Sequence, residues 1–537
     1  MKKWLPKVIL PLIVLIIAAV YYYVTLPAIN IHASGFWMFV IGLVVVVLAI
    51  YAMRKRMQTV QELKKSKFIT AGVVLILALV IVYAIGALLS SPIINAKKYR
   101  DLLQIEKRDY TEDITETDFS QIPLLDKASA TLLGNRKMGS MVDMVSQFEV
   151  SDLYSQINYQ GKPVRVTPLV YASTIKWLTN HSEGIPAYIM IDMATEETTL
   201  VKLDQPIKYS QSEYFNRNIY RHLRFKFPTY IFDELSFEID EEGTPYWICP
   251  VKQFEIGLFG GQTIGKVVLC NAQTGECTVY DLEDCPTWVD KANPADLLIR
   301  LYNYYGTLVN GYINSIFSQK GCLQSTDGYN YMAMEDDVWV YTGVTSVSGD
   351  LSNVGFVLMN QRTRETRYYE VNGAEEHSAM ESAEGQVQHL GYDATFPILV
   401  NVSDQPTYFM ALKDSAGLVK QYAMVNIQQY QNVATGDTVA ECKEQYLKLL
   451  NSNGIATEEE VPEAEVFHIN GTISRIAQAV VDGNSHFYLT VEGSNLIFDV
   501  SVQDFVQVVL LQEGDRVNMD YQEGSSVCKV VEFAITE

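Results

Sequence analysis

The 537-residue chain has few of the residues and motifs that catalysis would need. It contains 7 histidines, none of them in an H-E-x-x-H or related setting, and it has no G-x-S-x-G nucleophile elbow. Histidine is the side chain most often used as a general base, so this composition argues against nucleophilic hydrolysis. We therefore expect a protein that is not an enzyme, with no catalytic residue and no cofactor.

The cysteines also lack the spacing of a metal site. There are 7 of them and no C-x-x-C pair, so the short spacings typical of structural zinc are missing. An odd number leaves at least one thiol unpaired. We expect buried thiols, no metal, and one possible disulfide, between Cys270 and Cys277, which would bridge two strands of a hairpin.

Charge is missing from three long stretches near the start, residues 8–26, 36–53 and 68–89. Each is about long enough to cross a hydrocarbon core of ~30 Å as a helix that rises ~1.5 Å per residue. None has the polar stripe of a buried soluble helix. Residues 1–90 are therefore predicted to form a membrane domain with three spans. A cleaved signal peptide is the alternative for the first stretch, which is long for that role.

The charges beside these stretches predict their orientation. The loop 54–67 carries six basic residues and one acidic residue, whereas the loop 27–35 carries no Lys or Arg. By the positive-inside rule the N-terminus and loop 54–67 are cytoplasmic. The sequence thus predicts a multi-pass protein of the cell membrane with residues 91–537 outside the cytoplasm.

The part after residue 90 has little positive charge for its size. It holds 32 basic and 62 acidic residues, against 9 basic and 1 acidic in residues 1–90. A body this acidic repels nucleic acid, so we expect no nucleic-acid partner. The stretch GGQTIGKV, residues 260–267, matches the first seven positions of a phosphate-binding G-x-x-x-x-G-K-[ST] loop. Val267 replaces the residue that holds magnesium and a strand follows, so we expect no nucleotide.

What the exported part does contain is a repeated hairpin, here called hairpin A. Its pattern is an apolar strand, Asp or Asn, two residues, Thr, one residue, Glu, and a second strand. The Asx and Thr side chains are predicted to fold back on the turn backbone. The turn residues of the three copies are Asp192 and Thr195, Asn271 and Thr274, and Asn360 and Thr363. A second hairpin, hairpin B, has a Pro followed by aromatic and apolar residues at 184–192, 243–251 and 405–414.

These features divide the exported part into segments. We expect a stalk at 91–126, α+β repeats 1 and 2 at 127–290, a helix plus α+β repeat 3 at 291–450, an acidic linker at 451–465, and a small β-barrel at 466–537. The barrel strands are expected at 468–477, 487–491, 496–500, 516–521 and 528–535, with a short helix at 502–511. This order is that of an OB-like barrel. Its acidic surface lacks the basic groove that single-stranded nucleic acid needs.

The order of a helix and antiparallel strands ending in hairpin A resembles the PepSY family. Residues 268–280, with Asn271, Thr274, Gly275 and Glu276, match it best. The resemblance implies small α+β domains of exported or membrane proteins, linked to peptidase regulation and to binding at the cell envelope. The whole chain also resembles a family of three-span envelope proteins of Gram-positive bacteria, loosely labelled cell-shape determining.

The expected fold class is thus membrane α, with three transmembrane helices, plus α+β extracytoplasmic domains with PepSY-like antiparallel hairpin repeats and a C-terminal OB-like barrel. Repeated hairpins supply sheet surface and strand edges suited to assembly. We expect a non-enzymatic, membrane-anchored scaffold or binding protein of the bacterial envelope, which forms a homo-oligomer or a complex with other envelope proteins. The alternative is a PepSY-like inhibitor or regulator of an envelope peptidase or cell-wall enzyme.

Overall fold

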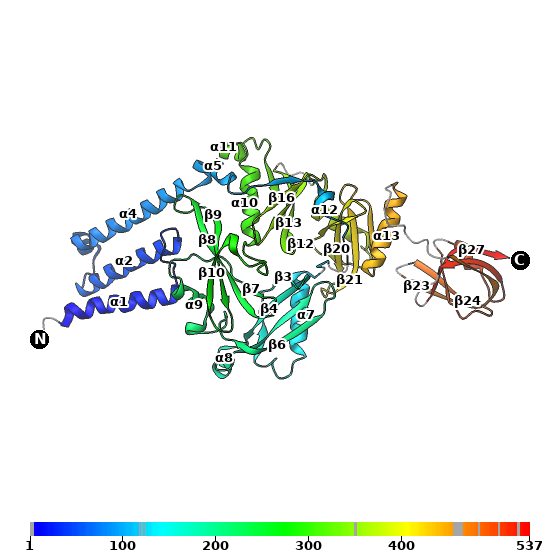
Figure 1. Cartoon of the computed structure of the whole chain (residues 1–537), viewed down its shortest axis with the longest axis horizontal. Helices are drawn as coiled ribbons and strands as arrows, with labels where there is room; N and C mark the ends of the chain where they lie inside the picture. Colours follow the sequence, from blue (N-terminus) through cyan, green and yellow to red (C-terminus); the bar gives the residue numbers. More distant parts are fainter. Residues whose placement is uncertain are drawn as a thin grey trace. The chain divides into compact units, whose positions relative to one another are not determined.

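The chain begins with apolar helices that lie side by side (Figure 1). The computed structural model describes residues 5–117, 119, 122–123, 125–347, 352–454, 466–481, 484–502, 505–522 and 527–536. The helices are α1 (Leu5–Thr25), α2 (Ser34–Arg54), the short α3 (Val60–Lys65) and α4 (Lys67–Leu89). Both α2 and α4 are long and apolar enough to cross a membrane, and α1 is apolar from Leu12 onward.

The segment expected to be a stalk is instead part of the folded body. It forms α5 (Pro92–Arg100), β1 (Glu106–Arg108) and α6 (Tyr110–Asp113). β1 pairs in parallel with β16 (Thr366–Tyr369) at the edge of a sheet. The buried Tyr110 donates a hydrogen bond to the Val400 carbonyl at 2.7 Å. The apolar residues of this segment are too irregularly spaced to show a helix or strand period, which is why the sequence did not reveal their burial.

After α4 the body is mostly β and begins with two antiparallel sheets that share a core. The first has the order β2-β4-β5-β6, with β3 paired to β4, and the second has the order β10-β9-β8-β7. Their elements, with the helices between them, are α7 (Lys127–Gly139), β2 (Phe148–Val150), β3 (Ser155–Tyr159), β4 (Lys162–Tyr171), α8 (Thr174–Asn180), β5 (Ile185–Asp192), β6 (Thr198–Ile207), η2 (Phe215–Arg217), α9 (Ile219–Lys226), β7 (Ser236–Ile239), β8 (Pro245–Ile256), β9 (Gly260–Asn271), β10 (Cys277–Asp281) and η3 (Leu282–Asp284).

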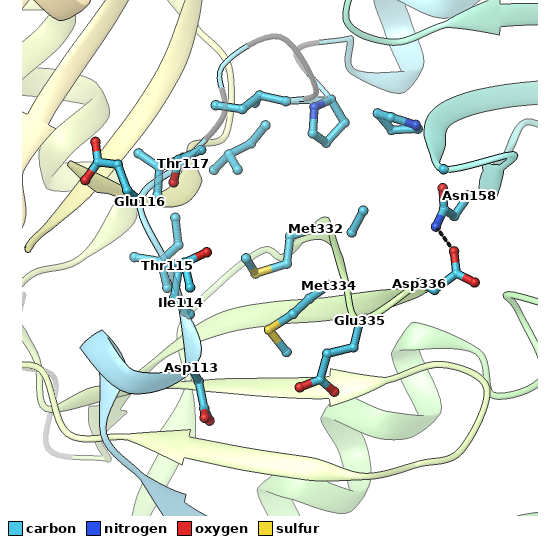
Figure 2. A pocket seen from close by; sticks show the side chains of 18 residues that line it. Asp113, Ile114, Thr115, Glu116, Thr117, Asn158, Met332, Met334, Glu335 and Asp336 are labelled. Atoms are coloured by element: carbon cyan, nitrogen blue, oxygen red, sulfur yellow. Dashed lines mark hydrogen bonds between the residues drawn. The ribbon is translucent and has the colours of Figure 1, made fainter.

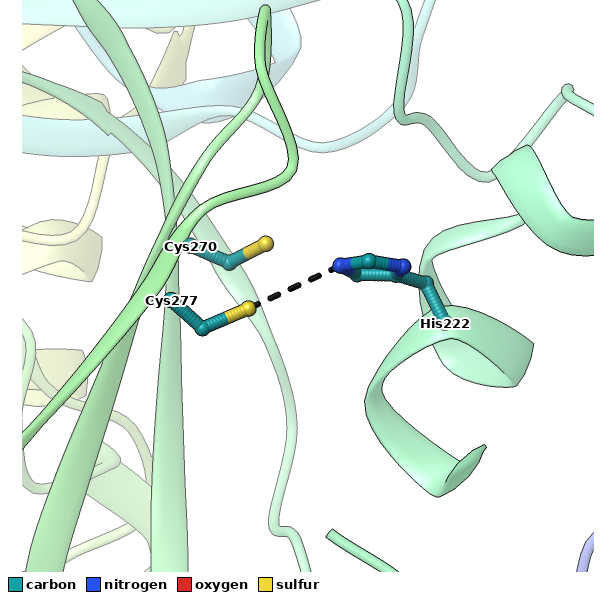
Figure 3. A group of neighbouring side chains, drawn as sticks. All are labelled: His222, Cys270 and Cys277. Carbon is teal, nitrogen blue, oxygen red and sulfur yellow. Dashed lines mark hydrogen bonds between the residues drawn. The ribbon is translucent and has the colours of Figure 1, made fainter. Parts of the chain in front are cut away.

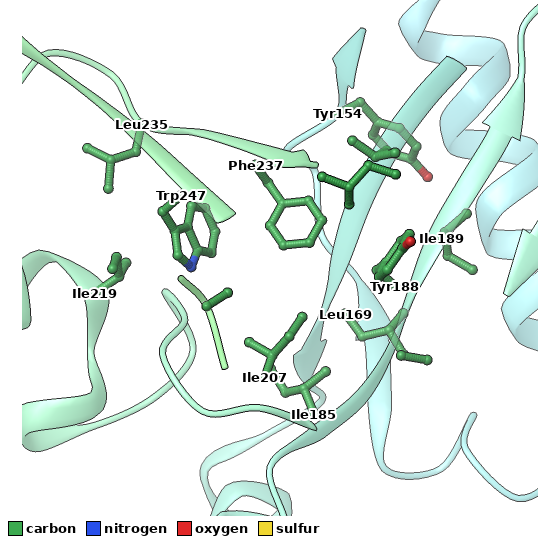
Figure 4. Close-up of a cluster of buried hydrophobic side chains, with 14 of the residues drawn as sticks. Tyr154, Leu169, Ile185, Tyr188, Ile189, Ile207, Ile219, Leu235, Phe237 and Trp247 are labelled. Carbon is green, nitrogen blue, oxygen red and sulfur yellow. The ribbon is translucent and has the colours of Figure 1, made fainter. Parts of the chain in front are cut away.

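The shared core is aromatic and aliphatic (Figure 4). Trp247 and Phe237 of the second sheet have ring centroids 5.5 Å apart, and Phe237 lies 6.0 Å from Tyr188 of the first sheet. Ile219 joins them from α9, which places that helix against both sheets. Each such aromatic side chain removes about 150–250 Å² from water, so this core fixes the two sheets on each other.

Two more sheets complete the body up to residue 449. A six-stranded sheet has the order β1-β16-β15-β13-β11, with β12 paired to β13, and a five-stranded sheet has the order β18-β20-β21-β22, with β19 paired to β20. A two-stranded ladder pairs β14, which lies between β13 and β15 in the chain, with β17, which follows β16. The elements are α10 (Ala295–Thr307), α11 (Gly311–Ile316), β11 (Leu323–Ser325), β12 (Asn330–Met334), β13 (Asp337–Ser346), β14 (Ser352–Asn353), β15 (Gly355–Asn360), β17 (Gly373–Ala374), α12 (Glu376–Gln386), β18 (Asp393–Ala394), β19 (Ile398–Val402), β20 (Gln405–Lys413), β21 (Val419–Asn426), β22 (Val433–Gly436) and α13 (Val439–Ser452).

Hairpin A is present at all three predicted places, as β5–β6, β9–β10 and β15–β16. The B stretches differ more among themselves. The second and third are hairpins, β7–β8 and β19–β20, but in the first α8 separates β4 from β5. The third A and third B hairpins lie in different sheets. The motif therefore recurs as a turn and its two strands, while the surroundings of each copy differ.

The described residues form two compact units, Met1–Leu449 and Leu450–Glu537. Residues 455–465 of the expected acidic linker lie outside the described residues. The second unit contains a closed barrel of five strands in the order β23-β24-β25-β27-β26, compatible with the OB-like expectation. Its elements are β23 (Val466–Val481), β24 (Asn484–Val491), β25 (Phe498–Ser501), η4 (Val506–Leu510), β26 (Arg516–Gln522) and β27 (Cys528–Thr536).

Candidate functional site

The tip of the β8–β9 hairpin, residues 257–259, lies against the ends of two apolar helices. The Phe259 N–H donates to Ser90 Oγ at 3.1 Å, just beyond the end of α4. The Phe259 ring centroid lies 4.7 Å from that of Tyr83 on α4 and 6.3 Å from that of Trp37 on α2. Aromatic side chains in this position are typical of a membrane–water interface.

Helix α9 contacts the end of α1 in the same way. Arg224 Nε donates to the Leu26 carbonyl at 2.9 Å, and the Arg221 guanidinium lies 4.3 Å from the centre of the Tyr23 ring. The C-terminal ends of α1 and α4 and the N-terminal end of α2 therefore all meet the same body. Two of these helices, α2 and α4, are long and apolar enough to cross a membrane.

The stretch that resembles a phosphate-binding loop is part of strand β9 and builds this junction. Gly260 and Gly261 leave no room for side chains: a Cβ on Gly260 would lie 2.1 Å from the Ser90 carbonyl oxygen. Gly261 also has φ +63°, a left-handed conformation that favours glycine. Lys266 on β9 forms an ion pair with Asp281 on β10. The glycines thus permit close packing of the hairpin tip on the end of α4.

The predicted turn residues of hairpin A make the same hydrogen bonds in all three copies. The Asx Oδ1 accepts from two backbone N–H groups, and the Thr Oγ1 accepts from the Glu N–H two residues on. The acceptors and donors are Asp192 with Ala194 and Thr195, Asn271 with Gln273 and Thr274, and Asn360 with Arg362 and Thr363, followed by Thr195 with Glu197, Thr274 with Glu276, and Thr363 with Glu365. These residues shape the turn.

The residue after the Thr adopts a left-handed conformation in every copy. Gly275 has φ +74°, and Glu196 and Arg364, which replace the glycine, have φ +59° and +67°. The left-handed region costs a residue with a Cβ roughly 1–2 kcal/mol. The turn hydrogen bonds hold this conformation even without glycine.

Next to the second turn the predicted cysteine pair meets a histidine (Figure 3). The Asn271 N–H donates to the Glu276 carbonyl, so Cys270 and Cys277, paired in the next register position, form a non-hydrogen-bonded pair. The Cα atoms of such pairs are about 4.5 Å apart, within the range of disulfides. Both thiols are free in this structure, and the disulfide between them stays a prediction.

His222, on α9, points its ring at these sulfurs. Its Nε2 lies 3.7 Å from Cys277 Sγ and 2.7 Å from the Gly275 carbonyl oxygen. In the described part of the chain, His222, Cys270 and Cys277 are the group whose potential ligand atoms come close enough for a metal, within 4.8 Å of one another. However, a carbonyl oxygen at 2.7 Å requires a proton on Nε2, and a nitrogen that carries a proton has no lone pair for a metal.

Electrostatics separates the two thiols. A hydrogen bond from Cys270, and a second, longer one from His222, whose one Nε2–H is shared with the Gly275 carbonyl, lower the pKa of the half-buried Cys277. The same contact with Cys277, together with burial, raises the pKa of Cys270. The contact with Cys277 also raises the pKa of His222. The geometry therefore favours a Cys277 thiolate beside a His222 imidazolium, with Cys270 kept protonated.

A cavity of about 550 Å³ lies elsewhere and is acidic (Figure 2). Each of its carboxylates already has a partner: Asp113 accepts from Arg108 and Tyr369, Glu335 from Arg367, Asp336 from Asn158, and Glu116 from the Ser403 N–H. The contact with Arg108 lowers the pKa of Asp113, so this group is held as a carboxylate. The acids serve as structural ion-pair and hydrogen-bond partners.

The sequence pointed to both cysteines but not to His222, because α9 and the second turn are far apart in the chain. No model of a known protein family and no curated protein sequence matches this chain.

Proposed function

We propose that this protein is a three-span membrane protein whose body lies outside the cytoplasm and acts as a non-enzymatic scaffold or binding protein, in a homo-oligomer or a complex with other envelope proteins. The observation that carries the proposal is the convergence of the ends of α1, α2 and α4 on one face of the body, at the β8–β9 tip and α9. The basic loop between α2 and α4 is at the opposite ends of these helices, as the positive-inside rule requires.

Two features of the body support a role in assembly. Strand β6 lies at the edge of the first sheet and has ten residues, of which only Ile207 is buried. An exposed edge can accept a strand from a partner. In addition, the carboxylates of the acidic cavity are occupied by structural contacts, which leaves no obvious acid–base pair there.

Limited proteolysis of intact cells tests the topology. Protease added outside should digest the body and leave a protected fragment that contains the loop 54–67. Digestion of that loop in intact cells, or full protection of the body, would contradict the proposed orientation. Permeabilised cells serve as the control, because there both regions should be cleaved.

Extraction in mild detergent tests the assembly. We expect a particle larger than one 60.6 kDa chain, after the mass of the detergent is subtracted, or a partner that stays bound through purification. A strictly monomeric chain with no retained partner would overturn the scaffold proposal while leaving the topology intact.

A further inference from the structure

We propose that Cys277 and Cys270 form a thiol–disulfide exchange site, in which Cys277 attacks a small external disulfide and Cys270 resolves the mixed disulfide. This activity goes beyond the proposed scaffold and does not depend on it. It rests on three observations: the cross-strand pairing of the two cysteines, the approach of His222 Nε2 to Cys277 Sγ, and the greater exposure of Cys277 than of Cys270.

The pairing makes the second step possible. Cys270 and Cys277 occupy a non-hydrogen-bonded cross-strand position beside a fixed turn, so their sulfurs can come within bonding distance without a change of register. The other cysteines of the second sheet and its surroundings do not have this relation to each other: Cys249 lies on β8 and Cys285 follows η3, and both are buried.

The surroundings of Cys277 decide which thiol attacks. His222 on α9 and Cys270 on β9 contact it, the charge of the exposed Lys226 on α9 acts on it through space, and the buried Cys249 lies on β8. The two cationic side chains favour the thiolate of Cys277, and the thiolate is the nucleophile in exchange. Tyr209, whose ring centroid is 4.5 Å from that of His222, packs against the imidazole on another side. His222 is thus a positioning residue for the charge of Cys277.

The exchange balances with an external disulfide R–S–S–R as the oxidant. The Cys277 thiolate attacks one sulfur, a Cys277–S–S–R bond forms, and R–S⁻ leaves and takes up the proton of the His222 imidazolium. Cys270 then loses its proton to the second leaving thiolate while its sulfur attacks Cys277 Sγ. Two electrons pass from the dithiol to the external disulfide, which becomes two R–SH, and the Cys270–Cys277 disulfide closes.

The test uses the reduced full chain in detergent and the chromogenic disulfide 5,5′-dithiobis(2-nitrobenzoate) at pH 6.5. We expect the unmodified chain to release two equivalents of thionitrobenzoate rapidly and to yield a Cys270–Cys277 disulfide on peptide mass mapping. Cys270→Ser should release one equivalent and keep the reagent on Cys277. Cys277→Ser should lose the rapid phase, and Cys285→Ser is the matched control that should keep both equivalents.

The role of His222 is tested by a pH profile. In His222→Gln the rate of the first step at pH 6.5 should fall about tenfold, which corresponds to a rise in the pKa of Cys277 from about 5 to roughly 7.5, while the rates at pH 9 should agree. A merely structural role would lower the rate equally at both pH values. Glutathione disulfide and a protein disulfide, used in place of the reagent, distinguish a small natural oxidant from a macromolecular one.

Several results would overturn the proposal. They are a disulfide that maps to other cysteines in the unmodified chain, rapid release of two equivalents by Cys277→Ser, or a rate in His222→Gln that is unchanged at pH 6.5. Binding of one equivalent of Zn²⁺ by the reduced chain, lost in His222→Gln and in either cysteine variant and blocking the exchange, would establish a metal site instead. The measurements on the unmodified chain do not depend on whether the variants fold.

Discussion

The hairpins β5–β6 and β9–β10 have the same turn and the same register, yet only one carries a cluster of reactive groups. Ile191 pairs with Thr198 in the first hairpin where Cys270 pairs with Cys277 in the second. In both, the inner partner is buried and the outer one is half-buried. The turn thus fixes the same backbone geometry whichever side chains occupy the paired positions. Reactivity depends on the two side chains beside the turn and on what packs against them.

The third hairpin, β15–β16, shows a different use of the same turn. Asn360 is buried, and its Nδ2 donates to Asp337 Oδ2 at 2.8 Å, while Arg362 in the turn forms a bidentate pair with the same carboxylate. This turn is tied to β13, whereas the second turn packs on the ring of Tyr209. Three copies of one local structure therefore differ in how strongly the rest of the body depends on them.

Exchange of the left-handed residue should give the largest change in stability. Gly275→Arg places a Cβ about 2.3 Å from the Tyr209 ring at φ +74°. The left-handed conformation and the overpacking together should lower the free energy of unfolding by roughly 2–4 kcal/mol. The reciprocal Arg364→Gly removes a Cβ at φ +67° and should change it by about 1 kcal/mol or less. Denaturant titration of the full chain in detergent measures the free energy of unfolding of both variants. An equal loss in the two variants would contradict the expectation that glycine is the less strained residue in both turns.

Removal of the Asx side chain should destabilise the third turn more than the second. The difference in free energy of unfolding should be smaller than for the left-handed residue. Asn360→Ala leaves two turn N–H groups without a partner and removes one hydrogen bond to the buried Asp337, which keeps its pair with Arg362, so we expect a loss of about 2–3 kcal/mol. Asn271→Ala affects a partly exposed turn that water can reach and should cost about 1 kcal/mol. The unfolding midpoints of the two variants measure the difference, and a larger loss for Asn271→Ala would contradict the contrast drawn between the turns.

The sequence was sufficient for features encoded locally. The Asx, Thr and Glu spacing predicted all three A turns, because those side chains bond to a backbone only two or three residues away. The alternation of apolar residues and the turn signals likewise placed all five barrel strands and the short helix between the third and fourth, here β23 to β27 and η4. Long uncharged runs predicted the apolar helices, because an apolar run of this length is by itself typical of a long apolar helix.

Features made by distant segments were not predictable from one sequence. β1 joins its sheet through a partner about 260 residues later, and nothing in its three charged residues marks it as a strand. His222 reaches Cys277 only because the shared core of the first two sheets holds α9 against the second hairpin. Glu196 and Arg364 gave no sign of a left-handed backbone by their identity, because the local turn hydrogen bonds around them hold that conformation without glycine.

The smallest effect, and the one that isolates the role of surroundings, comes from moving the cysteine pair to the first hairpin. The change is Ile191→Cys/Thr198→Cys in a chain that also carries Cys270→Ser/Cys277→Ser. The register is unchanged, so the grafted pair should still close to a disulfide. Thr198 Oγ1 donates to the Glu196 carbonyl, and no histidine bonds to it in the described part of the chain.

A thiol at Thr198 should therefore keep an ordinary pKa, and at pH 6.5 it should react about tenfold more slowly than Cys277 does in the unmodified chain. The gap should close toward pH 9, where both thiols are ionised. Release of thionitrobenzoate measures both rates, and Ile191→Cys/Thr198→Ser in the same background gives the baseline for a single buried thiol. An equal rate at pH 6.5 would mean that the turn and register alone make the site reactive and that His222 adds nothing. A slower rate with an intact disulfide would assign geometry to the hairpin and reactivity to α9.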